Sequence, residues 1–283
     1  MTELRWGERT YVMGIVNLTP DSFSGDGLAP AGASAEAVVD AARRQAAAFL
    51  DAGADILDVG AESSRPAQFY GDHPRPTPEA EAALAVPVVR ALRADAPDAL
   101  VSIDTSRGSV ARAALAAGAG FVNDVWGGRD DPDTVRAAAE AGAYLVLMHN
   151  QDRAEHPGSI FDAVVARLRD AVTDAERAGV SRDRLIVDPG IGFGKTADQS
   201  VELLHRLGEL KTELGGLPVL VGTSRKRFIG ELLGGAAPDQ RLEGTAATVA
   251  LAIAAGADIV RVHDVAHMVR TVRVADGIAR WRP

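Results

Sequence analysis

Seven polar or charged residues each stand at or shortly after the end of an apolar run, and their types could bind a flat heterocycle and an anion. They are Asn17, Asp104, Asn123, Asp188, Lys226, Arg261 and His263. Two carboxylates and an amide can accept the N–H groups of an amidine-like edge, while a lysine donates to the carbonyl oxygen or ring nitrogen of the same ring. An arginine beside a histidine and an asparagine suits phosphate oxygens. The residue types therefore predict a pocket with one half for a pterin or guanine edge and one half for phosphate.

The stretch LIVDPGIGFGKT, residues 185–196, carries the clearest of these signals. Its apolar run is typical of a strand buried on both faces, and Asp188 follows at the carboxyl end, where α/β folds hold their ligands. A phosphate-binding P-loop needs four residues between its two glycines, whereas Gly190 and Gly194 are separated by three. A dinucleotide fingerprint also fails, because the three glycines are evenly spaced. A plain glycine-rich turn, with Asp188 only capping neighbouring amides, stays open as an alternative.

The elements that must position these residues are eight strands alternating with helices. Apolar runs predict the strands at Tyr11 to Val16, Asp55 to Val59, Leu100 to Ile103, Gly120 to Val122, Tyr144 to Met148, Leu185 to Val187, Pro218 to Val221 and Ile259 to Val262. Helices are expected at about Ser34 to Ala52, Thr77 to Ala94, Ser109 to Ala117, Pro132 to Ala141, Ile160 to Ala178, Gln199 to Leu210, Thr245 to Ala255 and Val265 to Ala279.

This alternation, without a break in composition, predicts one α/β domain over residues 1–283, a single (β/α)8 TIM barrel. Leu4 to Trp6 and Thr10 to Val12 flank Gly7 to Arg9 and predict a short N-terminal hairpin. Active sites of this barrel lie at the carboxyl ends of the strands, which is where the seven polar residues stand. The long polar loops after the first and second strands are expected to act as lids.

Composition narrows the class of protein. The chain of 283 residues is 47% hydrophobic, has a net charge of -9 and contains no cysteine. The acidic balance argues against a nucleic-acid partner, and the lack of cysteine excludes disulfides and thiolate metal sites. No stretch approaches the roughly 20 apolar residues of a membrane span, and the first residues do not resemble a signal peptide. We therefore expect a cytoplasmic protein without a membrane partner.

Several residues also have a plain structural interpretation. Arg225, Lys226 and Arg227 could form a solvated basic cluster, although their place after a buried strand favours a function for Lys226. Asp264 precedes the last helix and is expected to cap it. His263 and His267 have a spacing that can bind metal on a helix, but His263 precedes that helix, so a metal site there is not expected. Asp58 and Glu62 are acidic and near the site, without an assigned role.

Six motifs in chain order make the sequence resemble the dihydropteroate synthase family nearly from end to end. They are MGIVNLTPDSFS from Met13, DVGAESSRP from Asp58, SIDTSRGSVARAALAAGAGFVNDVWG from Ser102, DPGIGFGKT from Asp188, GTSRKRFIG from Gly222 and RVHDV from Arg261. The resemblance implies condensation of 7,8-dihydropterin-6-ylmethyl diphosphate with 4-aminobenzoate, which gives 7,8-dihydropteroate and diphosphate in folate biosynthesis. It also implies Mg2+ on the diphosphate and a homodimer.

The resemblance also implies roles for individual residues. The family's pterin pocket corresponds to Asp104, Asn123, Met148, Asp188 and Lys226. Its diphosphate site corresponds to Asn17, Arg261 and His263, with Asn17 also on the metal. Its aminobenzoate site corresponds to Ser64, Arg65, Pro66, Phe193 and Ser224, partly assembled as the two long loops close. The residues expected to take part in catalysis are Asp104, Asp188, Lys226, Arg261 and His263.

Two alternatives remain open. A pterin-dependent methyltransferase on a related barrel would keep the acidic pocket, but it has little use for the Ser224 to Lys226 segment or for Arg261 and His263 as a diphosphate pair. A non-catalytic pterin-binding paralogue would not need the loop motifs TPDSFS and SSRP, and this chain has both.

Overall fold

Eight parallel strands form a barrel in the computed structural model, which describes residues 4–19, 27–28, 33–62, 75–151 and 158–281. The strands are β1 Tyr11–Asn17, β2 Ile56–Gly60, β3 Leu100–Asp104, β4 Phe121–Asp124, β5 Tyr144–Met148, β6 Leu185–Asp188, β7 Leu220–Val221 and β8 Ile259–Val262. Strands β1 to β6 pair in sequence order, and β8 lies between β1 and β7. A parallel bridge between Val187 and Val219 joins β6 to β7, which closes the barrel and confirms the predicted fold.

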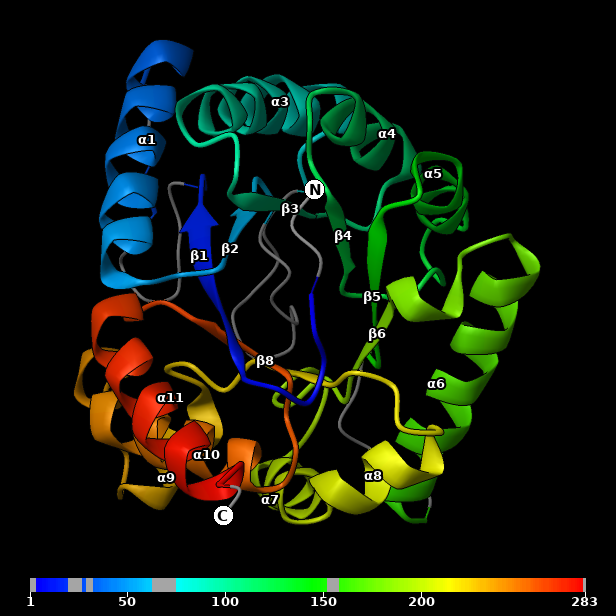
Figure 1. The fold of residues 1–283 in the computed structure, drawn as a ribbon, viewed down its shortest axis with the longest axis vertical. Coiled ribbons are helices and arrows are strands. Elements are labelled where there is room, and N and C mark those ends of the chain that lie inside the picture. The colour runs from blue at the N-terminus through cyan, green and yellow to red at the C-terminus, as the bar shows by residue number, and fades with distance from the viewer. Residues whose placement is uncertain (1–3, 20–26, 29–32, 63–74, 152–157, 282–283) are drawn as a thin grey trace.

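Helices surround the strands on the outside, as Figure 1 shows. They are α1 Ala35–Ala52, α3 Pro78–Asp95, α4 Gly108–Ala116, α5 Asp133–Ala141, α6 Ile160–Arg177, α7 Ala197–His205, α8 Leu207–Glu213, α9 Arg227–Leu232, α10 Leu242–Ala254 and α11 Val265–Ala279, with short 3-10 turns at Arg182–Arg184 and Pro238–Gln240. The single helix expected at Gln199 to Leu210 is two helices that meet at Arg206, and α9 was not expected. In the described ranges, no helix combines the length and the apolar character that crossing a membrane requires.

The core has two layers because side chains alternate along each strand. The cluster inside the barrel consists of Leu4, Tyr11, Met13, Ile56, Leu100, Phe121, Tyr144, Val146, Ile186, Leu220 and Ile259. The residues between them in sequence pack outwards against the helices, as Val260 and Val262 do. A residue two positions after an interior one faces the interior as well. Asp188 follows Ile186, and Arg261 follows Ile259, at this spacing, so both face inwards at the carboxyl ends of their strands.

The expected N-terminal hairpin forms only its turn, at residues 6–8, and residues 4–5 are not in a strand. Leu4 instead packs into the interior cluster. The ring of Trp6 stands edge-on to the rings of Tyr11 and Tyr144, with 5.7 and 6.1 Å between ring centres. Burying these side chains at the amino-terminal end of the barrel is worth more than the few ladder hydrogen bonds that so short a strand could form. The segment therefore plugs the barrel.

Candidate active site

A cavity of about 370 Å³, its open mouth included, lies at the carboxyl ends of the strands and contains most of the predicted site residues. Its lining consists of Ile15, Asn123, Val125, Met148, Asp188, Phe193, Gly222, Ser224, Lys226, Arg261 and His263. Asp104 is joined to it through Arg261. Asn17, at the end of β1, is not part of this lining, and its side-chain oxygen accepts a hydrogen bond from Thr19 Oγ1 at 3.0 Å. The predicted residues Ser64, Arg65 and Pro66 lie outside the described residues.

Arg261 connects two carboxylates on neighbouring strands, Asp58 in β2 and Asp104 in β3. Its Nε donates to Oδ2 of Asp58 at 2.6 Å, and its Nη2 donates to Oδ2 of Asp104 at 2.6 Å. Asn123 Nδ2 donates to the same Asp58 oxygen at 3.0 Å. Asp58 is completely buried, and its Oδ1 has no hydrogen-bond partner among the described residues. Asp58 therefore holds Arg261 and Asn123 in place from beneath the cavity.

The charges of this cluster are set by burial and by one another. Burial raises the pKa of Asp104 to about 7, against the attraction of Arg261 and with the repulsion of Asp58. Burial would lower the pKa of Arg261, but the carboxylates, Asp58 first, raise that pKa above its ordinary value. Arg261 therefore stays cationic, and burial places the pKa of Asp104 well above the ordinary value of an aspartate.

Asp188 has two roles in the structure. Its Oδ1 accepts a hydrogen bond from the Gly190 N–H at 2.7 Å, so the capping interpretation holds for this oxygen. The residue also lines the cavity, with only 5% of its surface exposed. Burial raises the pKa of Asp188 to about 6, although the Gly190 N–H and the nearby charge of Lys226 oppose the shift. Asp188 can therefore cap the Gly190 N–H and at the same time face the cavity.

Lys226 faces the acidic groups across the cavity. Burial lowers its pKa to about 7, while the negative charge of Asp188 opposes that change. Its Nζ lies 3.5 Å from the centre of the Phe193 ring, a cation–π contact. Lys226 therefore joins the acidic half of the cavity to the aromatic wall that Phe193 provides.

The basic run around Lys226 is an ordered turn, not a solvated cluster. Arg225 has φ +58, a left-handed conformation, and its guanidinium binds Asp264 through two hydrogen bonds of 2.9 and 2.6 Å. Thr245 Oγ1 accepts from the Arg225 N–H at 3.1 Å. Asp264 makes no side-chain cap of its helix, contrary to expectation. The turn places Ser224 beside His263, where Ser224 Oγ lies 2.9 Å from His263 Nδ1.

Glu62 binds arginines on both sides of it in space. It pairs with Arg75, and its Oε2 lies 3.1 Å from Arg107 Nη2. Arg107 in turn pairs with the buried Glu81 at 3.2 Å. Glu62 and Arg75 are the described residues on either side of residues 63–74, so this cluster ties both of them to the turn between β3 and α4.

Sequence reasoning missed the roles of Asp58 and Lys195. The position of Asp58, two residues after the interior Ile56, was the available signal, because it shows that the carboxylate faces into the barrel. Lys195 carries no such signal in the sequence, because the glycine spacing before it does not fit a P-loop, yet its side chain is almost fully buried. In the described ranges, no group of three or more histidine or acidic residues could hold a metal ion.

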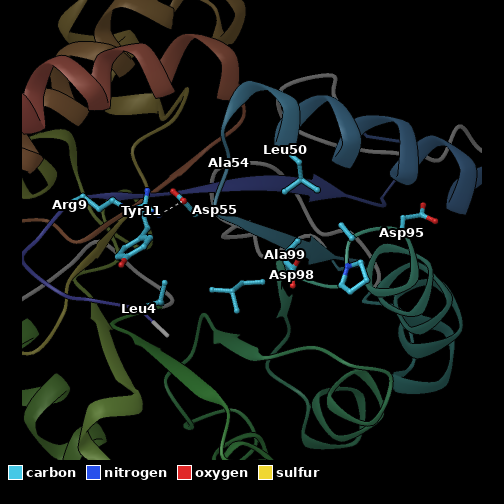
Figure 2. Close-up of a pocket in the computed structure, with 12 residues that line it drawn as sticks. Leu4, Arg9, Tyr11, Leu50, Ala54, Asp55, Asp95, Asp98 and Ala99 are labelled. Carbon is cyan, nitrogen blue, oxygen red and sulfur yellow. Dashed lines mark hydrogen bonds and ion pairs between the residues drawn. The ribbon is translucent and has the colours of Figure 1, made fainter. Parts of the chain in front are cut away.

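A larger hollow lies at the opposite, amino-terminal end of the barrel, and Figure 2 shows the residues around it. Three of its charged groups, Arg9, Asp55 and Asp95, are held in ion pairs. Asp55 accepts from Arg9 at 2.6 Å and from the Val12 N–H at 2.8 Å, and Asp95 binds Arg43 at 2.6 and 2.8 Å. Size alone therefore does not mark the functional cavity, because the buried ionisable groups gather at the other end.

Known proteins resemble the chain along nearly its whole length. It matches the family described as pterin binding enzyme over residues 13–263. It is 41% identical to a dihydropteroate synthase of Clostridium beijerinckii, over 98% of this chain and 97% of that protein. The structure of a Clostridium difficile dihydropteroate synthase in the presence of pteroic acid has a TM-score of 0.88 and 40% identity, covering 98% of this chain and 100% of that one. A Xanthomonas albilineans dihydropteroate synthase structure with 4-aminobenzoic acid has a TM-score of 0.86 and 40% identity, and the match covers 97% of this chain and 94% of that one.

Proposed function

The chain belongs to the pterin binding enzymes, and we propose from that premise that it catalyses the dihydropteroate synthase reaction. In this transfer, 4-aminobenzoate displaces diphosphate from 7,8-dihydropterin-6-ylmethyl diphosphate and gives 7,8-dihydropteroate. The observation that carries the proposal is the cavity in which Asp188, Asn123 and Lys226 converge at the carboxyl ends of three strands. These groups match the donors and acceptors along a pterin edge.

The pterin half of the site is assigned to the acidic side of the cavity. Asp188 and Asp104 would accept the N–H groups of the pterin, and Asn123 would complete that edge. Lys226 would donate to the carbonyl oxygen or to a ring nitrogen. Met148, 3% exposed, would cover one face of the ring with apolar contact.

Bond breaking leaves positive charge on the pterin, and the cavity is built to stabilise it. The methylene carbon–oxygen bond breaks with its electron pair going to the diphosphate, and the amine nitrogen forms the new bond to the methylene and then loses a proton. Asp104 and Asp188, when ionised, favour the cationic ring electrostatically. Arg261 and His263 would bind the leaving diphosphate, Arg261 through the part of its guanidinium that Asp58 and Asp104 do not use.

The aminobenzoate half is assigned to Phe193 and Ser224, with Ser64, Arg65 and Pro66 as proposed contributors from outside the described residues. An arylamine is neutral at pH 7, so the site has to orient it more than deprotonate it. The Phe193 ring would pack on the arene, and the contact of that ring with Lys226 keeps the two half-sites adjacent.

Mg2+ on the diphosphate is also a proposal. A magnesium ion is usually held by one or two protein oxygens together with substrate phosphates and water, so a full protein cage is not required. Asn17 offers an amide oxygen at the end of β1, which fits that mode of binding. When bound, the ion would neutralise charge on the leaving diphosphate.

A homodimer is proposed from the outer face of the last helix. Val274 and Ile278 of α11 are four residues apart, so they share one face, and Ile278 is 76% exposed. Trp281, three residues further on, and Leu251 on the neighbouring α10 are exposed as well. Exposed apolar surface of this kind supports an interface between copies. Sedimentation should show a dimer for the wild type and a monomer for Ile278→Glu.

The cytoplasmic location of the protein stays a prediction.

Incubation of the purified protein with the pterin diphosphate, 4-aminobenzoate and Mg2+ tests the proposed function. Dihydropteroate and diphosphate should appear in equal amounts, and only when all components are present. Binding of the pterin without product would identify a non-catalytic paralogue. Methyl transfer from methyltetrahydrofolate, in place of this condensation, would identify the methyltransferase.

A further inference from the structure

The glycine-rich segment after β6 is pressed against the chain that follows β5. Gly190, Gly192 and Gly194 have φ values of +68, +77 and +57. A Cβ atom on Gly190 would lie 1.9 Å from the His149 carbonyl oxygen, and one on Gly194 would lie 1.9 Å from that of Gln151. Only glycine fits such an approach in this conformation. Gly190 and Gly194 thus allow the close contact between the two loops, while Gly192 lies against the Lys226 side chain.

Lys195 fills the space that this contact encloses. Its side chain is among the largest that are fully buried, with 1% of the residue exposed. The ammonium donates to the carbonyl oxygens of Gly190 at 2.8 Å, Phe193 at 3.0 Å and His149 at 3.2 Å, and it lies 3.0 Å from His149 Nδ1. Lysine is almost never buried to this degree unless it is paired. These contacts bind the whole segment to the end of β5.

The segment held by Lys195 carries Phe193. The ring of Phe193 lines the cavity and lies 3.5 Å from Lys226 Nζ, so its position depends on the backbone that Lys195 fixes. Asp188 accepts one hydrogen bond from the segment, from the Gly190 N–H to its Oδ1, but its backbone belongs to β6 and is paired within the barrel. A loosened segment should therefore displace the aromatic wall and leave the pterin half of the cavity in place.

We propose that Lys195 is a positioning residue for the aminobenzoate half of the site, whose ammonium fixes the segment 189–194 so that Phe193 packs against the substrate. This inference rests on the proposed function. It assigns no contact between Lys195 and a substrate, because Lys195 faces backbone oxygens inside the loop. Loss of the ammonium changes aminobenzoate binding and not pterin binding.

The test compares Lys195→Met with Lys211→Met. Lys211 is a matched control, because it also donates to a backbone carbonyl, Gly256 at 2.8 Å, and to the buried carboxylate of Asp258 at 2.6 Å, outside the cavity lining. The wild type is assayed first, so that failure to form dihydropteroate counts against the proposed function alone. Lys195→Met should raise the KM for 4-aminobenzoate by about ten- to a hundredfold, with the dissociation constant of a non-reactive pterin within about twofold of wild type. Lys211→Met should lower Tm without changing either constant.

Lys195→Gln keeps a donor for one of the carbonyl oxygens and covers the case in which the Met variant does not fold. Its KM for 4-aminobenzoate should rise by less than that of the Met variant. Equal weakening of both substrates, or a lower Tm with both constants unchanged, overturns the proposal, because Lys195 would then be a residue of the fold only.

Discussion

Arg261 Nε and Asp58 Oδ2 are 2.6 Å apart, although 203 positions separate the two residues in the sequence. The same oxygen accepts from Asn123, so one buried carboxylate orients a residue proposed for the diphosphate half and a residue proposed for the pterin half. Removing one partner of a buried ion pair leaves the other charge without compensation. Asp58 is therefore important to the site although it does not line the cavity itself.

Asp58→Asn should lower the free energy of unfolding by about 3 kcal/mol or more, and kcat/KM for the pterin diphosphate should fall by about tenfold or more. Urea denaturation and initial rates measure the two effects. Asp95→Asn is the control, because Asp95 also pairs with an arginine, Arg43, at 2.6 Å but the pair is exposed, so the free energy of unfolding should not change measurably. Equal effects of the two substitutions would show that burial is not the cause.

Pterin binding should release protons near pH 6 and weaken below it. The pKa of Asp188 is raised to about 6 in the empty site, and pterin N–H groups bond more strongly to the ionised carboxylate than to the neutral acid, so binding pulls this pKa down. Calorimetry with a non-reactive dihydropterin, in two buffers of different ionisation enthalpy, counts the protons.

Asp188→Asn is the control for that measurement. It should lose the proton release near pH 6 and bind the pterin about ten- to a hundredfold more weakly at pH 7.5, since a hydrogen bond to a charged group contributes about 1.5 to 3 kcal/mol. Asp104, with a pKa of about 7, should still contribute at higher pH. Unchanged affinity in this variant with Tm intact would make Asp188 a cap only.

The positions of the site residues could be predicted from the sequence because strand geometry is local. Asp188, Asn123 and Arg261 follow interior residues at a spacing of two, and parallel strands bring their ends to one face. The contact between Asp58 and Arg261 could not be predicted, since β1 lies between their strands, β2 and β8, and the contact depends on how the two side chains reach across it inside the barrel. The prediction of an N-terminal hairpin was wrong for a related reason. Leu4 is stabilised more by burial in the barrel interior than by local strand pairing.

Arylsulfonamides should inhibit in competition with 4-aminobenzoate. An arylamine with a polar group in the para position presents the same ring to Phe193 and the same end to Ser224. Initial rates at several concentrations of both substrates distinguish the modes of inhibition. Phe193→Ala should raise the KM for 4-aminobenzoate and the sulfonamide Ki together. Competition with the pterin diphosphate would place the aminobenzoate site elsewhere.

Arg225→Gly and Arg225→Ala should separate backbone strain from ion pairing in the turn that carries Ser224 and Lys226. Both lose the two hydrogen bonds to Asp264, but only alanine keeps the strain of φ +58. The left-handed conformation costs a residue with a Cβ about 1 to 2 kcal/mol. Glycine usually lowers stability relative to alanine, because it has more conformational entropy in the unfolded state. Here the relief of strain should outweigh that entropy, so the glycine variant should be more stable than the alanine variant by about 1 kcal/mol. Urea midpoints at equal m-values measure this difference. An alanine variant as stable as the glycine variant would show that the turn is not strained.

Both variants should lose enzymatic activity to the same extent, because the turn that carries Lys226 is then no longer anchored to Asp264. Wild-type activity in either variant would show that Asp264 does not hold Lys226 in place.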